Sequence, residues 1–298
     1  EHLHARFQYR HTGVAAFLLA GLGFKVAAVP FQMWVPDVYQ GAPTPVTVFL
    51  SVGSKAAGFV VLTRVVDALA GPGSVIRAEM ENALLLTGAA TVLLGSLPAI
   101  FQTNVKRLLA YSSISHAGFL LLALGCRAAV RTDLAPGGVV AFYLATYLPM
   151  TVLAFALLIQ MRLNGRGEEL QDFKGIAGKS PLFALLMTLA FASLAGLPLT
   201  AGFFGKMWVF VGLVNQALWV PLVCAVIGAA AGFYYYFRVI LAIYTPEEGG
   251  ERLRMAFPAK AVACVLGGLV LVLGVYPKPL QSLLAQRPAG AVKTAQAR

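Results

Sequence analysis

The sequence has 298 residues, of which 59% are hydrophobic and only 12% are charged, and its mean hydropathy is +0.77. These values leave too little polar surface to cover a water-soluble fold of this size, so they indicate a polytopic membrane protein. The net charge of +11 comes mainly from basic residues in short segments between apolar runs, which is typical of topogenic charge and argues against nucleic-acid binding.

The apolar runs predict an all-α membrane helix bundle that forms a single domain over residues 1–298. A helix needs about 20 apolar residues to cross a bilayer, and eight runs meet this requirement. The run at 181–214 would measure about 51 Å as one straight helix, which exceeds the hydrocarbon core. We therefore expect it to be broken around Gly196-Leu197-Pro198. The expected spans are 13–34, 46–70, 83–102, 107–125, 138–161, 181–214, 218–243 and 258–276.

Two prolines mark the positions where helices are expected to break. Pro30 removes its own amide donor and clashes with the carbonyl of Val26, and Pro198 interrupts the long run described above. The Pro/Gly-rich stretch PDVYQGAPTPV at 36–46 predicts a turn that ends the first span and starts the second.

Three lysines, Lys25, Lys55 and Lys206, lie inside apolar runs. An ammonium group near the bilayer centre costs roughly 2.5–3.5 kcal/mol on insertion scales, so such residues are rare and indicate an ion pathway or proton relay. No acidic residue lies near these lysines within the expected spans, and His116 is the clearest polar alternative. For the lysines, the alternative to a relay is a side chain that snorkels to the membrane surface because the span boundary is misplaced. For His116, the alternative is a structural hydrogen bond across a helix interface.

The remaining polar and aromatic residues favour structural interpretations. Lys106 and Arg107 are interpreted as positive anchors at the start of a span, and Tyr234, Tyr235 and Tyr236 as packing or interface aromatics. No metal site is expected, because the cysteines are isolated and the histidines His2, His4 and His11 sit in a polar segment. The cysteines, which also predict no disulfide framework, are Cys126, Cys224 and Cys264.

Three long motifs carry a resemblance to a known family. They are GFKVAAVPFQMWVPDVYQGAPTPVTVFLSVGSKAA at 23–57, QTNVKRLLAYSSISHAGFLLLALG at 102–125 and SLAGLPLTAGFFGKMWVF at 193–210. Together they resemble the proton-translocating antiporter-like membrane subunits of respiratory complex I, NADH:quinone oxidoreductase, and their Mrp-type cation/proton antiporter relatives. The likeness is strongest to the N-type subunit.

The resemblance implies a fold of fourteen helices in two inverted repeats with two broken helices, of which this chain would supply the last eight. Lys25 then corresponds to the central pumping lysine, Lys55 to a connecting lysine, Lys206 to the lysine near the proton exit, and His116 to a polar link. The glutamate partner of Lys25 is expected upstream of Glu1.

The resemblance further implies that protons move through these residues while redox chemistry occurs elsewhere. No cofactor is expected in this chain, and flavin, iron–sulfur clusters and quinone are expected in partner subunits, which include neighbouring antiporter-like subunits. The implied location is the bacterial inner membrane, with the connections at 102–108, 162–180 and 238–260 in the cytoplasm by the positive-inside rule. An Mrp-type antiporter and a non-conducting structural subunit remain the alternatives.

Overall fold

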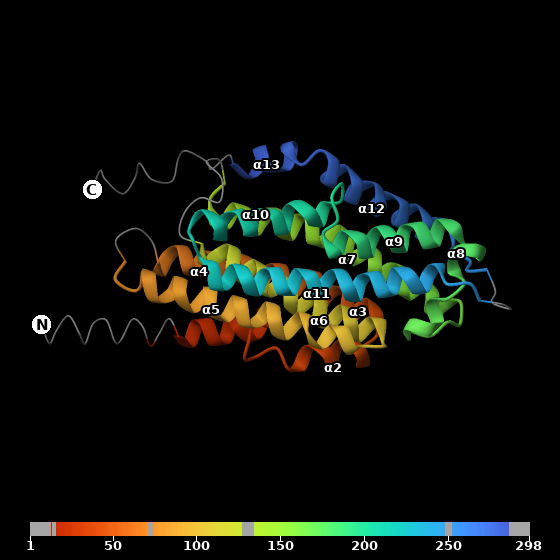
Figure 1. Cartoon of the computed structure of the whole chain (residues 1–298), viewed down its shortest axis with the longest axis horizontal. Helices are drawn as coiled ribbons and strands as arrows, with labels where there is room; N and C mark the ends of the chain where they lie inside the picture. The colour runs from red at the N-terminus through yellow and green to blue at the C-terminus, as the bar shows by residue number, and fades with distance from the viewer. Residues whose placement is uncertain (1–12, 14–15, 71–73, 127–133, 248–251, 286–298) are drawn as a thin grey trace, which may run out of the picture.

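The computed structural model describes residues 13, 16–70, 74–126, 134–247 and 252–285, and most of its long helices run side by side along one axis (Figure 1). The described residues form no β-strand, which confirms the predicted all-α class. After a first helix at Ala16–Val26, the α-helices are α2 (Trp34–Gly41), α3 (Thr44–Phe49), α4 (Lys55–Leu69), α5 (Arg77–Ser96), α6 (Val105–Gly125), α7 (Pro136–Leu163), α8 (Ile176–Lys179), α9 (Pro181–Ala195), α10 (Ala201–Asn215), α11 (Trp219–Tyr244), α12 (Phe257–Val275) and α13 (Lys278–Ala285).

Within the described residues, six continuous helical stretches are long and apolar enough to cross a membrane. A π-helix at Leu50–Ser54 joins α3 to α4, and a 3₁₀ turn at Pro98–Phe101 extends α5. Three shorter apolar helices, Ala16–Val26, α9 and α10, occupy the runs in which breaks were predicted. The six long stretches are Thr44–Leu69, Arg77–Phe101, Val105–Gly125, Pro136–Leu163, Trp219–Tyr244 and Phe257–Val275.

The first break lies between the helix Ala16–Val26 and α2. The helix ends at Val26, four residues before Pro30. This is expected, because the proline ring would clash with the Val26 carbonyl if the helix continued. The predicted turn over 36–46 is wrong in its first half, because α2 continues to Gly41. Pro36 is tolerated there since it lies in the first turn of α2, where an amide has no intrahelical partner.

The second break separates α9 from α10 where the sequence predicts it. Helix α9 ends at Ala195, Gly196 adopts the left-handed conformation with φ of +91°, and α10 begins at Ala201. Helix α12 packs directly on this break, because a Cβ at Gly274 would lie only 2.4 Å from the carbonyl oxygen of Leu199. The break is therefore a fixed part of the packed bundle.

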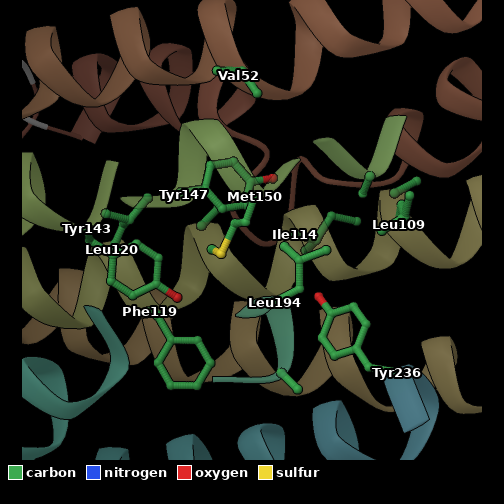
Figure 2. Packing of buried hydrophobic residues seen from close by; sticks show 14 of the residues in the cluster. Val52, Leu109, Ile114, Phe119, Leu120, Tyr143, Tyr147, Met150, Leu194 and Tyr236 are labelled. Carbon is green, nitrogen blue, oxygen red and sulfur yellow. The ribbon is translucent and has the colours of Figure 1, made fainter. Parts of the chain in front are cut away.

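Helix α6 forms the centre of the bundle and is buried along nearly its whole length. Glycines let α5 approach it closely: a Cβ at Gly95 or Gly118 would lie within 2.5 Å of a backbone nitrogen of the other helix. Small residues at helix interfaces are the usual means of close packing in membranes. Figure 2 shows apolar side chains of α6, including Ile114 and Leu120, packed among residues of the neighbouring helices.

Three connections, 102–108, 162–180 and 238–260, meet at the end of the bundle marked by the label α8 in Figure 1. Backbone hydrogen bonds of 2.8 Å join them, from Val105 to Glu168, from Leu170 to Thr103 and from Gly175 to Thr245. We call this the basic end, because it gathers the basic residues of all three connections. They are Lys106, Arg107, Arg162, Arg166, Lys174, Lys179, Arg238, Arg252, Arg254 and Lys260.

Candidate functional site

Lys55 lies directly after the π-helical segment and points into the bundle. Its side chain is 2% exposed, and Nζ donates hydrogen bonds of 2.5 Å to both the carbonyl oxygen and Oγ of Ser113 on α6. The Tyr39 hydroxyl of α2 lies 3.3 Å from the same Ser113 Oγ. Single π-helical turns often mark functional positions, and here the π turn immediately precedes the buried lysine.

Lys206 is buried on α10 beside the second helix break. Its Nζ donates to the carbonyl oxygens of Leu194 at 2.9 Å and Ala195 at 2.8 Å, the last two residues of α9. The break supplies these acceptors, because the carbonyls of a final helical turn have no intrahelical partner. The negative end of the α9 dipole also favours a cation at this position. The ammonium lies 5.6 Å from the centre of the Phe119 ring of α6.

His116 lies on α6 between two tyrosine hydroxyls. Its Nδ1 is 2.7 Å from the hydroxyl of Tyr143 on α7, and its Nε2 is 3.4 Å from the hydroxyl of Tyr236 on α11. The Tyr236 hydroxyl also bonds Ser112, the residue next to the Ser113 partner of Lys55. We call this set the buried polar row: Lys55, Ser113, Ser112, Tyr236, His116 and Tyr143.

The spacing of contacts along α6 orders the row. Lys55 contacts Ser113, His116 follows one turn later, and Lys206 faces Phe119 one further turn along. At 1.5 Å per residue, the span from 113 to 119 covers about 9 Å of helix axis. His116 therefore lies at an intermediate level between the two buried lysines.

An apolar shell surrounds the row. Figure 2 shows Tyr143, Tyr147 and Tyr236 among Ile114, Leu120 and Met150, with the tyrosines coming from helices on different sides of α6. Buried polar groups need hydrogen-bond partners, and each member of the row has one. Neither Lys55 nor Lys206 forms an ion pair with any described residue. Both buried ammonium groups are thus held by neutral acceptors.

Lys25 differs from the expectation that all three lysines are buried. It lies on the last turn of the helix Ala16–Val26 and is exposed on the surface of the bundle. Only the aliphatic part of the Lys25 side chain packs inward, against Gly58 of α4. A Cβ added at Gly58 would lie 3.2 Å from Lys25 Cγ. Gly58 is three residues after Lys55, so Lys25 and Lys55 share one stretch of α4. Its role stays a prediction.

The two predicted helix-breaking prolines both lie in non-helical segments. Pro30 is exposed in the first break, where Val29 N donates to Thr91 Oγ1 at 2.9 Å, and Pro198 lies in the second break. Neither proline is hydrogen-bonded to Lys55 or Lys206. Pro30 follows the end of the helix that carries Lys25. Pro198 follows the end of α9, whose last carbonyl oxygens bond Lys206.

Sequence reasoning missed two buried groups. Lys106 is interpreted from the sequence as a positive anchor at the start of a span, but its side chain is fully buried and donates to the Ala42 carbonyl at 2.6 Å, with Glu168 Oε1 3.8 Å away. Arg107, the other residue interpreted as an anchor, pairs with Asp37 at 2.7 Å. Tyr236 was interpreted as a packing residue, yet it bonds His116. The run of hydroxyl residues before His116 was the signal that could have suggested such partners.

No cluster of His, Cys, Asp or Glu within the described ranges is placed to hold a metal ion. Three residues considered for this role, His2, His4 and His11, lie outside those ranges. The assignment of flavin, iron–sulfur clusters and quinone to partner subunits stays a prediction.

Comparison with known proteins gives consistent matches along the chain. Residues 5–232 match the family model described as NADH:quinone oxidoreductase/Mrp antiporter, TM. NADH-quinone oxidoreductase subunit N 1 of Solibacter usitatus is 43% identical over 270 residues, which are 88% of this chain and 53% of that protein. Subunit N of Moorella thermoacetica is also 43% identical, over 89% of this chain and 54% of its own length. The chain thus spans about half the length of the curated relatives it matches.

Solved structures show the same fold. A chain of respiratory complex I from Thermus thermophilus with bound aureothin is 38% identical, with a TM-score of 0.76 over 92% of this chain and 59% of that one. A chain of the archaeal membrane-bound sulfane sulfur reductase is 28% identical with a TM-score of 0.81, over 91% of this chain and 54% of its own. The Mrp complex from Dietzia sp. DQ12-45-1b, at 18% identity and a TM-score of 0.80 over 96% of this chain and 61% of the other, shares the fold.

These matches and the six long apolar helices identify a multi-pass protein of the bacterial inner membrane. The chain belongs to the NADH:quinone oxidoreductase/Mrp antiporter transmembrane family.

Proposed function

We propose that the chain is the antiporter-like part of an N-type membrane subunit of NADH:quinone oxidoreductase and that it moves protons across the membrane. The relatives with 43% identity carry the name subunit N, which supports this subunit type. The partners would be the other membrane subunits of the complex, with neighbouring antiporter-like subunits in contact. Redox chemistry in those partner subunits would drive the movement of protons.

The observation that carries the proposal is the position of His116 between two buried lysines, hydrogen-bonded to a tyrosine on each side. Serine and tyrosine hydroxyls both donate and accept hydrogen bonds, so they pass protons without leaving a charge behind. A proton on Lys55 would reach Ser113, then the hydroxyl groups around His116, and finally Lys206. Each transfer leaves the donor able to accept the next proton.

The absence of acidic partners for Lys55 and Lys206 among the described residues supports proton exchange at both sites. A buried ammonium that is paired with a carboxylate is strongly held, whereas one held by neutral oxygens is stabilised less against desolvation. Lys206 depends on two carbonyl oxygens that are free to accept hydrogen bonds because α9 ends at Ala195. Lys25, exposed on this bundle beside the same stretch of α4 as Lys55, would deliver protons to Lys55.

The test uses the full-length subunit in its purified complex, reconstituted into vesicles. Lys55→Met, Lys206→Met and Lys25→Ala should each lower the number of protons moved per electron, because each removes one proton-carrying group. Lys278→Met is the matched control, since Lys278 is exposed on α13 and far along the sequence from the row. Quinone reduction and acidification of the vesicle lumen are measured together.

Full proton movement with intact quinone reduction in the Lys206→Met and Lys25→Ala variants would remove the relay assignment. Proton movement that requires sodium would instead indicate that the chain functions as an Mrp-type cation/proton antiporter. Unchanged transport combined with unchanged or higher stability in all lysine variants would indicate a non-conducting structural subunit.

A further inference from the structure

Two hollows flank the first turns of α12 at the basic end. The larger has a volume of about 750 Å³ and lies between the start of α9, the segment 252–256 and α12. Its lining includes Arg252, Arg254 and Lys260 but no acidic residue from the described part of the chain. All three cations are exposed, and none forms an ion pair with a described residue. The hollow therefore gathers three cations that no acidic residue of the described ranges pairs.

The backbone that carries these cations is held in place. Leu253 N donates to Ser180 Oγ at 2.9 Å, and Arg254 N donates to Asn164 Oδ1 at 2.8 Å. The Asn164 amide in turn donates to the Arg254 carbonyl at 2.9 Å. Segment 252–256 is thus fixed to the ends of α7 and α9, which presents its two arginines in a preformed arrangement.

The second hollow is mainly apolar and lies on the side of α12 that faces α7. Its volume is about 270 Å³, and Leu157, Ala259 and Val262 are among its lining residues. The outer surface of α12 is also apolar, since Phe257 is 82% exposed and Val265 is 69% exposed. An apolar surface of this kind on a membrane-spanning helix is suited to contact with lipid chains.

We propose that these two hollows bind one anionic phospholipid of the bilayer. Its phosphate would lie in the basic hollow against Arg252, Arg254 and Lys260, and an acyl chain would lie in the apolar hollow beside Val262. Basic pockets at the ends of spanning helices suit anionic headgroups, and arginine binds phosphate oxygens through two parallel hydrogen bonds. A free phosphate ion would leave the apolar hollow unused, so the pairing of the two hollows favours a lipid. The proposal does not depend on proton transfer by the chain.

The test measures lipid retention by native mass spectrometry of the full-length subunit in its purified complex. Dioleoylphosphatidylglycerol, which is anionic, and dioleoylphosphatidylcholine, which is zwitterionic, are added in turn to delipidated samples. The variant Arg252→Gln/Lys260→Gln removes two cations from the hollow. The control Arg64→Gln/Lys278→Gln removes two exposed cations from other helices, so both variants change the net charge equally.

The wild-type complex should retain the anionic lipid in preference to the zwitterionic one. The hollow variant should bind it roughly 30-fold more weakly, which corresponds to about 1 kcal/mol for each cation near an anionic headgroup. The control should bind as the wild type does. Equal retention of both lipids by the wild type would overturn the proposal, even if the variants did not assemble. So would equal loss in both variants, or displacement of the lipid by millimolar inorganic phosphate, which would assign the site to a free ion.

Discussion

The close approach of α5 to α6 makes a specific prediction about the substitution Gly95→Ala. A Cβ at this position would lie 2.3 Å from the Ser115 backbone nitrogen and 2.8 Å from its Cα, whereas ordinary contacts begin at 3.4 Å. Both neighbouring atoms are backbone, so no side-chain rotation relieves the overlap. The two helices would have to separate by about 1 Å.

The cost follows from this separation. Overpacking of a well-packed core typically costs about 1–3 kcal/mol. The hydrogen bond between the hydroxyls of Ser96 and Ser115, 2.7 Å long, would also lengthen, at a cost of about 0.5–1.5 kcal/mol. We expect Gly95→Ala to lower the free energy of unfolding by about 1.5–4.5 kcal/mol, the sum of these two costs. Because Ser115 precedes His116, the shift would also displace the buried polar row.

The assay is thermal unfolding of the purified full-length protein in which the half-buried Cys224 and the exposed Cys264 are replaced by alanine, followed by a thiol-reactive dye that labels the buried Cys126 once it becomes accessible. Gly268→Ala on α12 is the matched control, since a Cβ there meets no atom within 4 Å. That change should stabilise the helix slightly, because alanine is the better helix former. Equal unfolding temperatures for the two variants would refute the steric reasoning.

Three further predictions address the site and its supports. Tyr236→Phe removes a hydroxyl of the buried polar row and should lower proton movement per electron with assembly intact, whereas Tyr234→Phe, at an exposed position, should leave it unchanged. Lys106→Met removes a buried charged hydrogen bond and should lower the free energy of unfolding by about 1.5–3 kcal/mol, as measured by thermal unfolding. Lys106→Arg should recover part of this stability. Gly196→Ala forces a side chain into the left-handed region at φ +91°, which costs roughly 1–2 kcal/mol, and it places a Cβ 3.1 Å from Lys206 Cδ. We therefore expect lower stability and lower proton transport. Unchanged stability and transport in this variant would contradict the role given to the second helix break.

Much of the architecture follows from local properties of the sequence. Hydropathy located the apolar runs, and a run too long for one span predicted the break that the structure places at Gly196 to Thr200. Proline predicted where the helix Ala16–Val26 ends. The same local rule failed for 36–46, because proline opposes a helix in its interior but not in its first turn, and the sequence alone did not show where α2 begins.

The lysines show the limit of such reasoning. Depth within an apolar run is a property of the sequence, and it singled out Lys25, Lys55 and Lys206. The direction in which a side chain leaves its helix depends on the neighbouring helices, and this direction buries Lys55 and Lys206 but leaves Lys25 exposed on the described bundle. Lys106, at the edge of its run, is buried because α2 and the 162–174 connection cover it.

By itself the sequence determined which segments are helical and apolar, where two of them break and which charged residues lie deep in a run, because hydropathy, proline chemistry and chain length act locally. Only the tertiary structure decided that Tyr236 bonds His116 while Tyr234, two residues away, is exposed. Successive residues turn by about 100° around a helix. Which of them enters the core therefore depends on the packing of helices that are distant in the chain.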